Sequence, residues 1–204
     1  MDSGEVVRIQ EQTDATINGI TLSDGSQLPT LDWFVETSVA YPETELHIEL
    51  KAPQNKDLFA KYDVAKVVGL TQALLEKHNC LERSHILSFD EPVLAEVRRQ
   101  KAGLKTVRLY NFWEHIPLPA DRNQWIQNQT ISISALHATH EVVLFCHAHN
   151  TQVCVWVDTD GLIQEGEDHY RRMIELGVDY ICTDFPLEAK AFIRQEALKR
   201  AVTQ

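Results

Sequence analysis

The sequence predicts an α/β protein of the TIM (β/α)8-barrel type that contains about six of the eight strand–helix units. Short apolar or alternating segments recur between helical patterns, which predicts parallel strands joined by right-handed helical crossovers. Several strand segments are apolar throughout, as expected for strands that are covered on both faces. Because a closed barrel has eight strands, the count predicts a chain that lacks the first strands of the fold.

The first part of the chain holds one strong strand signal. Residues 5–9 predict a short strand, and turn pairs follow at Asn18-Gly19 and Asp24-Gly25. Apolar residues at helical spacing predict a helix over 31–39. Residues 46–51 then alternate strictly between apolar and ionisable side chains, which predicts a strand with two different faces.

The remaining elements follow in regular order. Asp63 and Asp90 are positioned to cap helices at their amino ends. Gly103, Asn150 and Gly177 stand where three helices should end, because such residues favour the backbone conformation found past a helix end. The further predicted strands are 85–88, 106–109, 130–134, 153–157 and 180–183, and the further predicted helices are 64–78, 91–102, 139–149, 167–176 and 187–200.

The composition predicts one globular domain over residues 1–204. Apolar residues make up 44% of the 204 residues, which is enough to bury a core. The formal net charge of −11 argues against binding to nucleic acid or to an anionic membrane. Four cysteines without a C-x-x-C pair, and the lack of a long apolar run, predict a cytoplasmic protein with no membrane span. Nothing in the sequence predicts an oligomeric state.

The alternating segment 46–51 is the first candidate for chemistry. One of its faces carries His47, Glu49 and Lys51, while the other is apolar. Function in a parallel barrel resides at the carboxyl ends of the strands, where Glu49 and Lys51 are expected. A carboxylate there can bind a divalent cation while an ammonium group faces a phosphate oxygen. The alternative is a salt bridge between the two residues that has no catalytic role.

Other motifs are weak or absent. Four histidines crowd residues 137–149, but Leu144 stands where a helical metalloprotease site beginning at His140 needs its second histidine. Residues 156–167 resemble a calcium-binding loop in part, yet Trp156 occupies its first ligand position. The chain has neither a glycine-rich nucleotide motif nor the G-x-S-x-G of serine hydrolases.

Several segments resemble the glycerophosphodiester phosphodiesterase family. The segment 46–51, L-H-I-E-L-K, is similar to the family's L-x-I-E-x-K strand, and 176–186 is similar to its final G-V-D-x-I-x-T-D-x-P signature. Residues 28–31, 88–89 and 153–158 resemble its I-P-T-L helix entry, its S-F pair and its late strand. The segments follow the family's order along the chain. The family's fold is a TIM barrel, which agrees with the count of units.

The resemblance implies hydrolysis of a glycerophosphodiester to a glycerol phosphate and an alcohol, in lipid metabolism, with a divalent cation, Mg²⁺ or Ca²⁺. It assigns Glu49 as a metal ligand and Lys51 as a catalytic cation on the phosphate side. Trp156 would form a wall against the glycerol moiety, and Phe89 is a second substrate-binding candidate. The expected partner is therefore a small phosphodiester substrate.

The resemblance also predicts what the chain does not carry. The family's H-R-G and E-x-D motifs would precede Met1, and residues 6–10, which align with its V-V-x-H-D stretch, have Ile9 in place of the histidine. The chain would then supply one of the family's metal ligands and neither of its catalytic histidines. Two functions stay open: a phosphodiesterase represented by its C-terminal three-quarters, and a catalytically inactive barrel remnant that acts as a binding or partner module.

Overall fold

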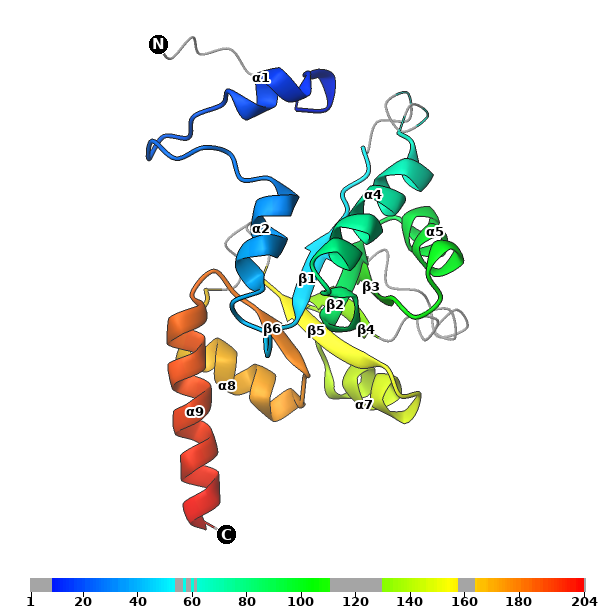
Figure 1. Cartoon of the computed structure of the whole chain (residues 1–204). Coiled ribbons are helices and arrows are strands. Elements are labelled where there is room, and N and C mark those ends of the chain that lie inside the picture. Colours follow the sequence, from blue (N-terminus) through cyan, green and yellow to red (C-terminus); the bar gives the residue numbers. More distant parts are fainter. Residues whose placement is uncertain are drawn as a thin grey trace.

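Six parallel strands form one curled sheet in the computed structural model of the chain (Figure 1). The structure describes residues 9–53, 57, 60, 62–110, 130–157 and 164–203. Within these ranges the strands lie side by side in chain order, from β1 to β6. Sequential parallel strands with intervening helices are the architecture of a TIM barrel, so the predicted fold class is confirmed for the part of the barrel that the strands build.

The register of the sheet fixes which residues share a face. His47 lies opposite His85, and Trp156 lies opposite both Ser134 and Cys182. Residues paired in this way project to the same side of a parallel sheet. The strands are β1 (Leu46–Glu49), β2 (Ser84–Ser88), β3 (Lys105–Tyr110), β4 (Thr130–Ser134), β5 (Gln152–Trp156) and β6 (Tyr180–Cys182).

Side-chain caps begin several of the helices. Thr30, Asp63 and Thr139 each accept a hydrogen bond from a backbone N–H in the first turn of the helix that follows. The α-helices are α1 (Asp14–Asn18), α2 (Leu31–Ser38), α4 (Val64–Lys77), α5 (Glu91–Gln100), α7 (His140–Ala148), α8 (Glu167–Leu176) and α9 (Pro186–Thr203). Two 3-10 turns are η1 (Ile9–Glu11) and η2 (Leu81–Arg83).

Most predicted elements agree with the structure to within a few residues, and the differences are local. The helix expected over 91–102 ends at Gln100, and the Asp90 side chain makes no cap bond. The Asp90 N–H bonds the Ser88 hydroxyl at 3.1 Å. Ile9 begins a 3-10 turn and is not part of a strand. Residues 5–8, and the part of the calcium-loop resemblance over 158–163, lie outside the described residues.

The apolar cores lie between the sheet and its helices. Ile48 and Ile86 of the first two strands pack with buried residues of α4 and α5, among them Leu75 and Val97. A second core joins β4 and β5 to α7 and α8, where Met173 is fully buried. These contacts cover one face of the sheet, so the alternate residues project to the concave side.

The concave face carries polar side chains that meet across the sheet. Tyr180 on β6 donates its hydroxyl to Glu45, the residue before β1, at 3.1 Å. The ring centroids of Tyr180 and His47 are 5.3 Å apart. Among the described strands, β1 pairs only with β2 and β6 only with β5, so the first and last strands meet through side chains and not through a backbone ladder.

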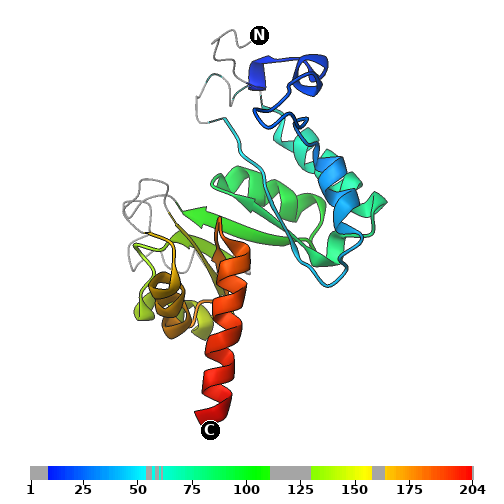
Figure 2. The ribbon, with the colours of Figure 1, turned by 90° about the vertical axis from the view of Figure 1, so that its left-hand side faces the viewer.

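The segment before α2 lies apart from the sheet. Figures 1 and 2 both show α1 beyond the end of α2, away from the strands. Helix α2 itself is attached to α4, because Asp32 bonds Lys77 Nζ at 2.9 Å and His78 Nε2 at 2.8 Å. The described residues that position the strand ends are therefore those from α2 onward.

Candidate functional site

The carboxyl end of β1 presents the predicted acid and cation side by side. Glu49 is the last residue of the strand, and Lys51 follows two residues later. The Lys51 Nζ lies 3.7 Å from a carboxylate oxygen of Glu49. The Glu49 side chain is 31% exposed and that of Lys51 is 76% exposed, so the ammonium group remains open to solvent. This pair is also the salt bridge that the alternative interpretation predicted.

Burial and the lysine act on Glu49 in opposite directions. Partial burial raises the pKa of the Glu49 carboxyl, because desolvation disfavours its charged form, and the positive charge of Lys51 partly offsets this. A carboxylate that is short of hydration gains more from an added cation than a fully solvated one does. The environment of Glu49 therefore favours a bound positive charge.

The two predicted aromatic residues meet at the same end of the sheet. Phe89 follows β2 and Trp156 ends β5, yet their ring centroids are 6.4 Å apart at an interplanar angle of 88°. Such an edge-to-face contact is a favourable arrangement for aromatic pairs. The indole Nε1 of Trp156 is buried and has no hydrogen-bond partner among the described residues. An unpartnered buried donor of this kind is available to a ligand oxygen.

Polar contacts fix the backbone around Phe89. The Ser88 hydroxyl donates to the Leu50 carbonyl at 2.8 Å, which ties the end of β2 to the end of β1. The Arg108 guanidinium donates to the Phe89 carbonyl from the neighbouring strand. The position of Phe89 therefore depends on groups from β1, β2 and β3. Lys51 follows Leu50, whose carbonyl accepts the Ser88 bond.

Carboxylates lie near the carboxyl end of β6. The Glu165 carboxylate accepts hydrogen bonds from the hydroxyls of Tyr170 and Thr183 and from the Asp184 N–H. Burial raises the pKa of the Cys182 thiol, and the negative charges of Asp184, Glu165 and Glu49 raise it further. Three carboxylates therefore lie near the Cys182 thiol at this end of the sheet. A concentration of negative charge of this kind attracts cations.

A second polar group lies at the opposite, amino-terminal end of the strands and was not predicted. Glu45, His47 and His85 place one ligand-type atom each within 4.8 Å of one another. Burial lowers the pKa of both histidines, so their neutral forms are favoured at neutral pH. The signal was present in the sequence, since Glu45 and His47 share the alternating face and His85 is near the start of the next strand.

The histidines that crowd 137–149 have separate partners. His147 bonds the Asp179 carboxylate at 2.9 Å, and His149 bonds the Phe145 carbonyl at 2.8 Å. Within the ranges that the structure describes, no group of three metal-ligating side chains includes either of them.

Comparison with known proteins decides the family. The model of the glycerophosphoryl diester phosphodiesterase family matches residues 5–188, which is most of the chain. The chain belongs to this family. The match includes Glu49, Phe89 and Trp156, and the predicted resemblance is therefore confirmed.

Solved structures with the same fold include three phosphodiesterases. A glycerophosphodiester phosphodiesterase from Parabacteroides distasonis is 20% identical, with a TM-score of 0.75, over 93% of this chain and 74% of that one. A Silicibacter pomeroyi protein, whose assignment to this enzyme class is provisional, is 24% identical with a TM-score of 0.70 and 85% of this chain covered. An Oleispira antarctica phosphodiesterase, solved with the product sn-glycerol-3-phosphate, is 16% identical with a TM-score of 0.64 and 81% covered.

At these low sequence identities, the structural similarity establishes the fold alone. The chain spans 58% of the Silicibacter chain and 61% of the Oleispira chain. No protein with a curated description matches the sequence. Among the described residues, no helix combines the length and apolar character needed to cross a membrane.

The residues around Glu49 supply only part of a binding site for the divalent cation expected in the phosphodiesterase family. Glu49 offers a partly desolvated carboxylate, but no group of three ligating side chains in the described part of the chain contains it. Divalent magnesium or calcium needs several oxygen ligands. The described residues alone therefore do not form that site.

Proposed function

We propose that the protein acts on glycerophosphodiesters, hydrolysing them to a glycerol phosphate and an alcohol in lipid metabolism. The observation that carries this proposal is the family match over residues 5–188, which includes all of the strand ends described above. The carboxylates near Cys182 and the partly desolvated Glu49 support the use of a divalent cation, Mg²⁺ or Ca²⁺.

Four residues receive roles in this proposal. Glu49 contributes a carboxylate ligand for the cation, and Lys51, whose ammonium group is largely exposed, binds a phosphate oxygen. The edge-to-face pair of Phe89 and Trp156 binds the glycerol moiety, with the unpartnered Trp156 Nε1 as a donor to one of its oxygens. The substrate is accordingly a small phosphodiester, and the free cysteines support a reducing, cytoplasmic location.

The test has two measurements. Calorimetric titration with sn-glycerol 3-phosphate measures product binding, and a coupled assay measures glycerol 3-phosphate release from glycerophosphocholine with Mg²⁺ or Ca²⁺. We expect binding that Lys51→Met weakens about tenfold, because one charge-assisted contact to phosphate is lost. We expect release that Glu49→Gln reduces by at least about a hundredfold, because the cation loses a charged ligand.

Glu36→Gln on the exposed side of α2 is the matched control, since it removes one carboxylate far from the strand ends. Release that is unaffected by Glu49→Gln would contradict the assignment of the site. Binding of glycerol 3-phosphate without any release would contradict the hydrolase proposal and support the binding-module alternative.

A further inference from the structure

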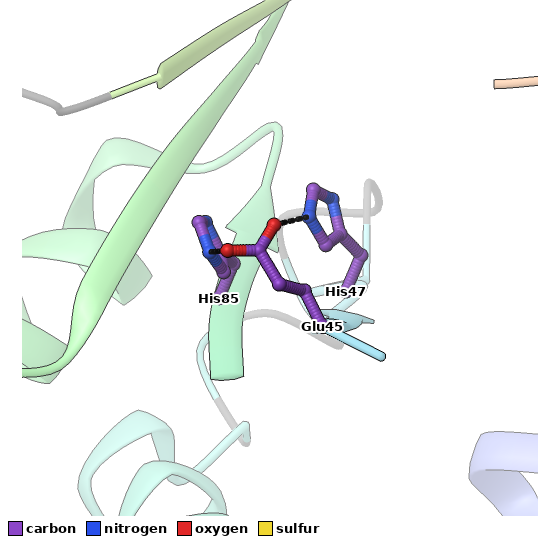
Figure 3. A group of neighbouring side chains, drawn as sticks. All are labelled: Glu45, His47 and His85. Carbon is purple, nitrogen blue, oxygen red and sulfur yellow. Dashed lines mark ion pairs between the residues drawn. The ribbon is translucent and has the colours of Figure 1, made fainter. Parts of the chain in front are cut away.

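The polar group at the amino-terminal end of the strands has the composition of a transition-metal site. We propose that Glu45, His47 and His85 bind a zinc ion. Figure 3 shows the Glu45 carboxylate between the two imidazoles, with a ring nitrogen of each histidine directed toward it. The His47 Nε2 lies 4.0 Å from one carboxylate oxygen, and the His85 Nε2 lies 3.5 Å from the other.

The geometry needs only a small contraction to bind the ion. The three ligand atoms lie no more than 4.8 Å from one another, so a point exists within about 2.8 Å of all three. Zinc–nitrogen bonds are about 2.0–2.1 Å long, so each ligand atom has to move inward by less than about 1 Å. The imidazole rings of His47 and His85 are stacked at 4.6 Å, so both nitrogens already lie on the same side of the two strands. Small rotations of three side chains therefore suffice, and the backbone register of β1 and β2 can stay as it is.

The Nε2 atom of His85 is the ring nitrogen that faces the cluster. The polar contacts that the described residues make to this ring lie on the Nε2 side, toward Glu45 and Lys105. The His85 side chain is only 1% exposed, so the packing around it holds the ring in this orientation. The Nε2 atom is therefore positioned to bind the ion.

The donor types select the metal. Two imidazole nitrogens and one carboxylate are typical of zinc sites that keep a fourth position for water, whereas magnesium and calcium prefer oxygen ligands. The Glu45 side chain is 40% exposed, so the ion and its water can enter from the solvent side. This site is distinct from that of Glu49, which lies at the other end of β1.

Two neighbouring groups compete with the ion. The Lys105 Nζ lies 3.4 Å from the His85 Nε2 and 3.6 Å from a Glu45 oxygen, where it already neutralises the carboxylate. Its side chain is 40% exposed, so it can turn out to solvent when a dication binds. The Tyr180 hydroxyl also donates to Glu45 and would have to rotate away or remain as an outer contact. Lys105 therefore competes with zinc and lowers the affinity of the site for the ion.

The location predicts a structural role for the zinc ion. Function in a barrel of parallel strands resides at the carboxyl ends, and the amino-terminal face serves stability. An ion held by Glu45, His47 and His85 would join β1 to β2 and fix the loop that enters β1. Zinc should therefore raise the melting temperature of the protein without being required for any reaction at the other end of the sheet.

The experiment titrates the whole chain with Zn²⁺ by calorimetry and with Co²⁺ by visible absorption. We expect one ion per chain, with cobalt bands typical of four-coordinate nitrogen and oxygen ligation and no thiolate charge-transfer band. Glu45→Gln and His47→Gln should each weaken zinc binding at least about tenfold, because each removes a direct ligand. Since His85 is fully buried, its replacement also tests folding, and the other two variants carry the result.

Lys105→Met provides the sharpest arm of the experiment. Removing the competing positive charge should tighten zinc binding about tenfold, an effect that binding elsewhere on the surface would not show. His140→Gln, which removes an imidazole of α7 outside the cluster, should leave the affinity unchanged. Equal affinity in the wild type and the Glu45, His47 and Lys105 variants would overturn the proposal, as would the absence of binding. Because no substrate is used, neither result bears on hydrolysis.

Discussion

At the scale of single residues, Arg83 holds the entry to the sheet together. Its guanidinium donates to the backbone carbonyls of Ser38, Tyr41 and Thr44, and to the Ser38 hydroxyl at 2.9 Å. It also contacts the Cys80 sulfur at 3.2 Å. These acceptors come from the end of α2, the loop before β1 and the turn before β2, so one side chain joins three segments. The planar, five-donor guanidinium is suited to this, and an ammonium group is not.

Replacement of Arg83 by lysine should therefore be costly although it conserves charge. We expect Arg83→Lys to lower the free energy of unfolding by about 2 kcal/mol, because three backbone carbonyls lose donors and the bond to the Ser38 carbonyl is partly buried. Equilibrium unfolding in urea measures the change. Arg99→Lys is the control, because Arg99 makes only an exposed pair with Glu96 and should cost less than about 0.5 kcal/mol. Equal losses in the two variants would contradict this account.

The proximity of two candidate residues could be predicted from the sequence where one strand supplies both of them. The pairing of Glu49 with Lys51 follows from period-two alternation, and its position at the strand end follows from the fold. The meeting of Phe89 with Trp156 depends on how far the sheet curls, which no local pattern specifies. The cluster of Glu45, His47 and His85 was missed for a similar reason, because it requires the register between two strands.

At the scale of elements, the end of α8 illustrates how a single glycine ends a helix. Gly177 adopts a left-handed conformation with φ of 77°, and its N–H bonds the carbonyls of Met173 and Ile174. Two residues later, the Asp179 carboxylate accepts from the Val153 N–H at 2.7 Å, which places β6 beside β5. The turn at Gly177 therefore sets the position of the last strand as well as the end of the helix.

A side chain at Gly177 should strain this turn. We expect Gly177→Ala to cost about 1 kcal/mol of stability, because a non-glycine residue is disfavoured in the left-handed region, although the surrounding space is open. Gly103→Ala is the matched control, since Gly103 also has open space but no positive φ. Thermal unfolding followed by circular dichroism compares the two. A control variant as unstable as Gly177→Ala would refute the conformational explanation.

Element boundaries could be predicted best where a start or stop signal is intrinsic to the residue. Helix α8 has the expected bounds, and it ends at Leu176 because Gly177 stops it. After α7, Asn150 has the expected left-handed conformation, with φ of 58°. Helix α5 ends earlier than expected because Lys101 leaves the helical conformation, with φ of −145° and ψ of 90°, while the Gln100 side chain bonds the Ala65 carbonyl of α4. That tertiary contact is invisible to helix periodicity.

At the scale of the whole molecule, buried histidines make stability depend on pH. Burial lowers the pKa of His169, which is 6% exposed and stacks edge-on against Tyr170. The negative charge of Glu165 opposes this shift and the positive charge of Arg172 supports it. A lowered folded-state pKa means that the unfolded chain binds the proton more tightly. The stability is therefore complete above the unfolded pKa of about 6.5 and is lost as the pH falls toward the folded value.

We expect urea unfolding to show a lower free energy of unfolding at about pH 5 than at about pH 7.5, since the unfolded chain takes up more protons. His169→Gln should reduce the slope of the free energy of unfolding with pH by the contribution of one imidazole, while the variant remains folded at the higher pH. The measurement is the free energy of unfolding at several pH values for both proteins. An identical slope in the variant would show that His169 does not contribute.

The contact between Tyr180 and Glu45 has a consequence for the order of assembly. Every backbone ladder in the sheet joins a strand to the next one along the chain, whereas this hydroxyl–carboxylate bond joins residues 135 positions apart. Neighbour-to-neighbour pairing can proceed as each segment leaves the ribosome, at a low entropic cost per step. The contact between β6 and the residue before β1 can form only after Tyr180 has been synthesised, so it cannot precede the pairing of the earlier strands for want of its donor.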